Sequence, residues 1–162
     1  MHFQAFGRLF ALPNRWRLIS FSLLATCLSL AGAPAFAAQR VGVLKNLEGE
    51  VTVLRVGQRQ PALSGAVVQE GDRIITGAKG AAALTLVDGT VLTVGPNASL
   101  DLTHHVYDPT SQQGSLLLNL LQGTLRMITG AMAKTNPELI KVTTPTAVVG
   151  VRGTDFIVEA NP

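Results

Sequence analysis

Past residue 40 the apolar residues fall into short groups, separated by glycine-containing breaks about every eight to twelve residues. The groups are rich in Val, Leu, Ile and Thr, which fit the pleated surface of a sheet. This rhythm predicts an all-β fold of mainly antiparallel short strands, arranged as a sandwich or a coiled β stack. The predicted strands are residues 41–47, 51–56, 66–68, 73–76, 82–87, 90–94, 99–107, 115–121, 124–128, 140–143, 147–151 and 154–159.

Two hairpins are predicted within this pattern. Asp88-Gly89 is a typical two-residue loop, which would pair Leu86 with Val91 and leave both faces of the hairpin largely apolar. Such a hairpin would be covered on both sides. Gly123 is expected to turn residues 115–121 back onto residues 124–128.

Helical structure is expected mainly at the N-terminus, as a signal helix. Elsewhere, residues 130–139 have room for a short helix, limited by Asn136 because a residue that precedes proline favours extended backbone.

The first 37 residues have the three parts of a secretory signal peptide. Three arginines precede the uncharged apolar run of residues 18–30, and a small-x-small cleavage site ends at Ala37. Residues 1–37 are therefore predicted to be a signal peptide, and residues 38–162 an exported domain. The localisation that follows is periplasmic or secreted, in a Gram-negative type of envelope.

Two alternatives for this segment stay open. An uncleaved segment would anchor the chain in the membrane, although thirteen apolar residues span only about 20 Å of the roughly 30 Å hydrocarbon core. Cys27 could mark a lipoprotein site, although threonine precedes it where a smaller residue is usual. Cys27 is the single cysteine, so the domain after Ala37 has no disulfide and no thiol nucleophile.

The net charge of the predicted exported domain differs from that of the whole chain. The formal net charge is +3, but Arg8, Arg15 and Arg17 belong to the signal, leaving ten basic residues against ten acidic ones. A neutral domain without a basic cluster lacks the footprint of a nucleic-acid binder.

We find no arrangement of residues that indicates catalysis, a metal or a cofactor. His104 and His105 are the histidines beyond the signal, and adjacent strand residues point to opposite faces, so they do not form one metal site. The carboxylates show no spacing that would pair them beside a cleft. The sequence also lacks a phosphate-binding glycine loop and a nucleophile elbow. We therefore expect no enzyme activity.

The segment with the strongest pattern is residues 144–156, Thr-Pro-Thr-Ala-Val-Val-Gly-Val-Arg-Gly-Thr-Asp-Phe. Glycines within a β-branched run mark bulges or bends, so the segment is predicted to be a bent strand. Arg152 would either pair with Asp155 or a carbonyl to hold the bend, or present its guanidinium to a partner. The candidates for a structural or interaction role are Gly150, Arg152, Gly153, Thr154 and Asp155.

This segment resembles the most recognisable stretch of the FecR domain, and two earlier stretches match the same family in the same order. They are Gly-Asp-Arg-Ile-Ile-Thr-Gly at residues 71–77 and Ala-Leu-Thr-Leu-Val-Asp-Gly-Thr at residues 83–90. The resemblance implies a FecR-like β domain. Family members continue with further hairpins, so the domain is expected to be minimal or truncated at its C-terminus.

In its best-known members the family transmits a signal from an outer-membrane transporter to a sigma factor bound in the cytoplasm. Only about seventeen residues precede the apolar run here, so the resemblance extends to the periplasmic module alone. We expect an exported protein-interaction or signal-receiving module whose partner is another envelope protein, contacted through an exposed sheet edge. The alternative is a domain that binds cell-wall glycan or another small ligand.

Overall fold

A computed structural model describes residues 39–151 and 155–161, and it confirms the all-β prediction. Strands account for most of the described residues, with one α-helical turn and one 3₁₀ turn between β9 and β10. The first six strands are β1 (Arg40–Glu48), β2 (Val51–Arg55), β3 (Gln58–Pro61), β4 (Val67–Gln69), β5 (Arg73–Thr76) and β6 (Ala81–Leu86). They are followed by β7 (Val91–Val94), β8 (Ser99–Tyr107), β9 (Gly114–Ile128), α2 (Met132–Thr135), η1 (Pro137–Leu139), β10 (Ile140–Thr143), β11 (Val148–Gly150) and β12 (Asp155–Ala160).

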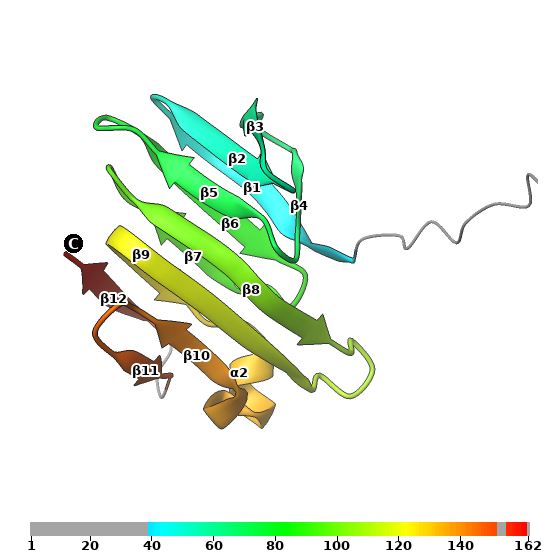
Figure 1. Cartoon of the computed structure of the whole chain (residues 1–162). Helices are drawn as coiled ribbons and strands as arrows, with labels where there is room; N and C mark the ends of the chain where they lie inside the picture. The colour runs from blue at the N-terminus through cyan, green and yellow to red at the C-terminus, as the bar shows by residue number, and fades with distance from the viewer. Residues whose placement is uncertain (1–38, 152–154, 162) are drawn as a thin grey trace, which may run out of the picture. The chain divides into compact units, whose positions relative to one another are not determined.

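The strands form two sheets that share β9. Sheet A has the order β4-β1-β6-β7-β9-β12, and sheet B has the order β3-β2-β5-β8-β9-β10-β11. All neighbours are antiparallel except β10, which runs parallel to β9. The first half of β9 pairs in sheet B and the second half in sheet A, so one strand closes both sheets over the core. Figure 1 shows β3 and β4 at one end of this stack and β11 and β12 at the other.

Four corners lie on one side of the stack, where the chain passes between the sheets. They are residues 49–50, 77–80, 95–98 and 122–124, and we call them the corner stack. Backbone bonds link successive corners: the Gly77 amide donates to the Glu50 carbonyl at 2.9 Å, and the Asn97 amide to the Gly77 carbonyl at 3.0 Å. The Gly95 amide donates to the Thr124 carbonyl at 2.9 Å. Each crossover is thereby hydrogen-bonded to the next.

The core lies between the two sheets and follows the period of two expected of strands. Along β6, Ala82, Leu84 and Leu86 are buried, whereas the residues between them are partly exposed. The largest fully buried side chains are Leu44, Ile74, Leu84, Leu92, Leu100, Leu102, Leu116, Leu118, Leu120, Leu125, Met127 and Met132. At about 25 cal/mol per Å² of buried apolar surface, this cluster is the main favourable contribution to folding.

The predicted register of the first hairpin is wrong by one residue. Leu84 pairs with Leu92 and Thr85 with Val91, and the Leu86 amide donates to the Thr90 carbonyl, so three residues form the loop in place of two. Gly89 takes a φ of +85°, as in a three-residue loop that ends in a left-handed glycine. A shift of one residue exchanges the faces, and the hairpin is therefore buried on one side only.

The second predicted hairpin does not exist. Gly123 bends a continuous β9 at the fourth corner, so that residues 115–121 and 124–128 join different sheets and never pair with each other. Its φ is +88°, and a Cβ at this position would lie 2.5 Å from the Cα of Ala98. Glycine is required here by the close approach of two corners, not by a tight turn.

The remaining differences are local. Sequence reasoning missed β3, whose four residues are all exposed, because Gln58–Pro61 has no apolar alternation. The short helix within residues 130–139 is confirmed as α2 and η1, separated at Asn136. The predicted signal helix lies outside the described residues. Within the described part of the chain, no helix has the length and apolar character needed to cross a bilayer.

Candidate functional site

Asp72, in the first of the two earlier motifs, acts as a structural anchor. Its carboxylate is buried and accepts hydrogen bonds from Nε and Nη2 of Arg55 at 2.7 and 2.6 Å and from the Gln69 amide at 2.8 Å. These bonds raise the pKa of the Arg55 guanidinium further above its already high value. Asp72 thereby fixes the end of β2 against the start of β5.

Two threonines make comparable connections. The Thr76 hydroxyl donates to the Gly95 carbonyl at 2.6 Å and accepts from the Ala98 amide at 2.9 Å, tying two corners together. The Thr90 hydroxyl donates to Asp88 at 2.6 Å and accepts from the Gly130 amide at 3.0 Å. The two motif threonines thus hold the backbone of neighbouring segments in place. This structural role accounts for their presence in the motifs.

The histidines point to opposite faces of β8, as predicted. His104 is half exposed and lies 3.4 Å from a carboxylate oxygen of Glu70. His105 is 1% exposed, and neither ring nitrogen has a hydrogen-bond partner among the described residues. Burial lowers the pKa of His105, against the opposing influence of Asp88 and Glu70. Within the described residues, no group of three or more His, Cys, Asp or Glu side chains could hold a metal ion.

The structure brings two of the five predicted site residues together at the C-terminal end of the stack. Gly150 ends β11 and Asp155 begins β12, whereas Arg152, Gly153 and Thr154 lie outside the described residues. Asp155 makes a bidentate ion pair with Arg126 of β9, with distances of 3.0 Å to Nε and 2.6 Å to Nη2. These hydrogen bonds lower the pKa of the Asp155 carboxyl. The described partner of Asp155 is therefore an arginine that sequence reasoning did not single out.

A groove of about 510 Å³ runs beside these residues, along β12. Among the described residues, β12 is hydrogen-bonded only to β9, so its other edge forms part of the groove. We call this hollow the edge groove. It is lined by Val149, Gly150, Val151, Asp155, Phe156, Ile157, Val158 and Glu159.

The groove has an apolar side and a charged side. Phe156 and Val158 pair with the buried Met127 and Leu125 of β9 and thus face the core. On the outer face of β12, Ile157 is 66% exposed between Asp155 and Glu159. Within the described residues, the Glu159 side chain makes no hydrogen bond and no ion pair. Among the described residues, the edge thus offers backbone groups without a strand partner, an apolar floor and an acidic outer face.

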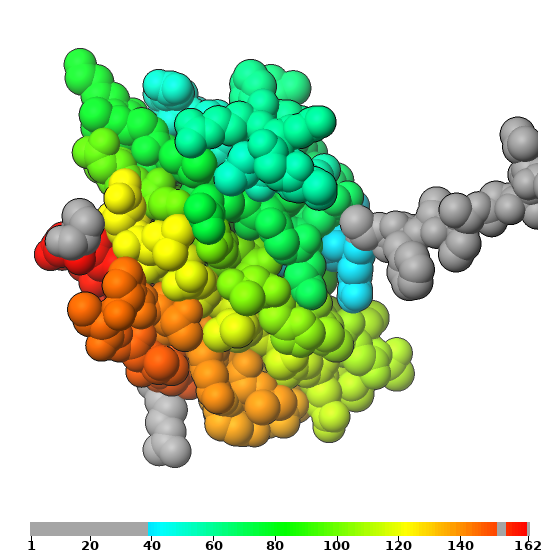
Figure 2. All heavy atoms as spheres, in the orientation of Figure 1, coloured from blue at the N-terminus to red at the C-terminus, as the bar shows by residue number. Residues whose placement is uncertain are grey.

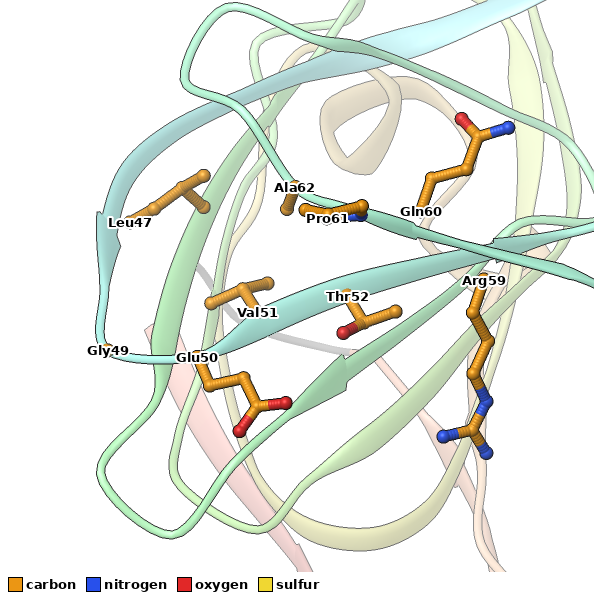
Figure 3. A pocket seen from close by; sticks show the side chains of 9 residues that line it. All are labelled: Leu47, Gly49, Glu50, Val51, Thr52, Arg59, Gln60, Pro61 and Ala62. Carbon is orange, nitrogen blue, oxygen red and sulfur yellow. The ribbon is translucent and has the colours of Figure 1, made fainter.

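A second hollow of about 500 Å³ lies at the opposite end, beside β2 and β3 (Figure 3). Arg59 and Gln60 extend to opposite sides of β3 there, as alternation along a strand requires. Figure 3 shows the charged ends of Glu50 and Arg59 lying apart, and the two side chains form no ion pair with each other. Since no charged groups of the described residues pair in this hollow, we do not take it as the site.

Little in the described chain favours sugar binding. The described aromatic residues are Tyr107 and Phe156, and both are partly buried against the core. A glycan site commonly exposes an aromatic face for stacking, which neither ring does fully.

Comparisons with known proteins give two matches. The family model described as "FecR protein" matches residues 72–162, more than half of the chain. β1 to β4 precede this span, although β1 and β2 are hydrogen-bonded to β6 and β5 within it. A solved structure titled "Cell surface anchoring domain" is 29% identical over 40% of this chain and 87% of its own, with a TM-score of 0.39. None of the curated proteins matches the chain.

Proposed function

Because the chain belongs to the FecR family, we propose that its β domain is an exported, non-enzymatic module that receives an extended segment of another envelope protein. The segment would add, within the edge groove, to the edge of β12 that is not hydrogen-bonded to β9 among the described residues, as a further strand of sheet A. Main-chain hydrogen bonds would supply affinity, and the side chains along the groove would select the sequence.

The observation that carries this proposal is the difference between the two ends of the stack. At the first end, β3 has four residues and includes Pro61, and β4 has three residues. Short edges and proline are devices that prevent a sheet from pairing with other chains. At the other end β12 has six residues, no proline and the exposed Ile157. In Figure 2 the two ends lie on opposite sides of the described domain, so access to one does not depend on the other.

Site-specific photocrosslinking in the native cell tests the proposal. A photoreactive phenylalanine analogue in place of Ile157 should give a discrete adduct with one envelope protein. The matched control is Leu63, which is 70% exposed in the connection between β3 and β4, at the opposite end. Adducts of the same protein from both positions, or none from Ile157, would overturn the proposal.

Export is a separate part of the proposal, and it has its own measurement. The predicted signal peptide supports a periplasmic or secreted location, so the protein recovered from the cell envelope should begin at Ala38. A membrane-bound chain that begins at Met1 would instead establish the anchor, and one that begins at a lipidated Cys27 would establish a lipoprotein.

A further inference from the structure

The side chains on the outer face of β12 restrict what the edge groove can receive. Asp155, Ile157 and Glu159 occupy alternate positions and all face away from the core. Along the strand they read acid, apolar, acid. Residues directly opposite each other on neighbouring strands interact across about 5 Å, where like charges are destabilising and opposite charges stabilising.

A second copy of the same strand is a poor occupant for this reason. When two copies join these edges in antiparallel orientation, their outer faces lie on the same side of the sheet, so residue 155, 157 or 159 of one copy lies opposite one of the same three in the other. Full antiparallel overlap places Asp155 opposite Glu159 twice. Two carboxylate pairs then meet, and a shift that avoids them gives up part of the six-residue edge.

The two acids are not equivalent. Asp155 is already neutralised by the guanidinium fork of Arg126. Glu159 is exposed, and its side chain makes no ion pair within the described residues. It therefore has the greater capacity to attract a cation from an incoming strand, and it is the position at which a charge change should have the larger effect.

We infer that the edge groove selects an extended protein segment with the outward pattern base-x-apolar-x-base. The apolar residue would lie opposite Ile157, and the two residues marked x would be apolar and face Phe156 and Val158. Because acid, apolar, acid reads the same in both directions, the pattern holds for parallel and antiparallel addition. This inference rests on the proposed strand addition and specifies the chemistry of the partner.

Three capped synthetic peptides test the pattern on the full exported domain. They share the core X-Val-Ile-Val-X, where X is Lys, Gln or Glu, and binding is followed through the backbone NMR signals of β12. At low salt we expect the Lys peptide to bind about tenfold more tightly than the Glu peptide, because the pair with Glu159, and to a smaller extent the pair with the ion-paired Asp155, changes from repulsion to attraction. The difference should shrink in 0.5 M NaCl, since these charges are exposed to solvent.

Charge reversal in the protein provides the decisive comparison. Glu159→Lys should remove most of the preference for the Lys peptide, or reverse it. Glu48→Lys makes the same change in net charge at an exposed position at the end of β1 and should leave the preference intact. Equal effects of the two variants would overturn the inference, because the preference would then follow net charge alone.

The outcomes also separate this inference from the proposed function. If the three peptides shift the β12 signals with equal affinity, strand addition holds and the charge pattern is wrong. If no peptide shifts those signals while Ile157 still crosslinks to a partner, the partner binds by another mode and the pattern is again wrong. If no peptide shifts the β12 signals and Ile157 gives no crosslink, the proposed function itself is wrong.

Discussion

Replacing His105 by leucine should stabilise the protein and remove part of its pH dependence. His105 is 1% exposed, and both ring nitrogens lack hydrogen-bond partners in the part of the chain that the structure describes. A buried polar group without a partner costs about 1–3 kcal/mol. Leucine has a comparable size and no polar atom, so we expect a gain of about 1–3 kcal/mol in the free energy of unfolding at pH 7.5.

The pH dependence follows from the lowered pKa of His105. Burial keeps the folded state neutral at pH values where the unfolded chain, with an ordinary pKa of about 6.5, already binds a proton. The free energy of unfolding is therefore unaffected by His105 protonation above about pH 6.5, and it decreases as the pH falls toward the folded-state pKa of His105. Between pH 7.5 and pH 5.5 the loss reaches up to about 1.4 kcal/mol, since one proton changes stability by about 1.4 kcal/mol per pH unit.

Urea unfolding of the purified protein at both pH values measures this loss. The window lies above the usual pKa values of Asp and Glu, so carboxylate titration contributes little. His104→Gln is the control, because His104 is the adjacent residue on the exposed face and should leave the loss in place. An equal loss in wild type and His105→Leu would refute the reasoning, as would a less stable His105→Leu at pH 7.5.

Three further substitutions test how the fold is held. Asp72→Asn should cost about 3 kcal/mol in urea unfolding, because it leaves the partly buried Arg55 guanidinium without its carboxylate; a cost below about 1 kcal/mol would contradict the anchor. Gly123→Ala should destabilise by at least about 2 kcal/mol, since the φ of +88° and the contact with Ala98 both disfavour a side chain; an unchanged melting temperature would show that the corner relaxes. Val56→Asn should raise stability by about 1 kcal/mol in thermal unfolding, because Val56 has a φ of +48° in a two-residue hairpin loop that favours asparagine. No gain would mean that the positive φ of Val56 does not strain the backbone.

The alternation of apolar residues was sufficient to predict the fold class and most strands. Arg73–Thr76, Ser99–Tyr107 and Ile140–Thr143 match their predicted bounds, because their apolar faces lie against the core. β3 could not be predicted, since its polar residues are exposed and its pairing with β2 depends on the loop between them.

The errors arose where glycine serves more than one geometry. Asp-Gly is common in both two-residue and three-residue hairpin loops, and only the packing of Leu84 and Leu92 decides between them. A glycine between two apolar runs also marks either a turn or a bend. At Gly123 the bend is favoured by the close contact with Ala98, a residue that is distant in sequence and could not be identified from the local pattern. The predicted residues Gly150 and Asp155 line the edge groove, and their role in binding stays a prediction. Arg126 and Glu159 were recognised only from strand pairing.

The repeated corners have a consequence for how such domains change length. Each corner joins one strand of sheet A to one strand of sheet B, and its backbone bonds reach mainly the neighbouring corner. The four strands β5 to β8 are therefore a modular unit, since their duplication would extend both sheets and keep every new neighbour antiparallel. A partial insertion would reverse the direction of the strands that follow. Homologous domains should therefore differ in size by whole units of this kind.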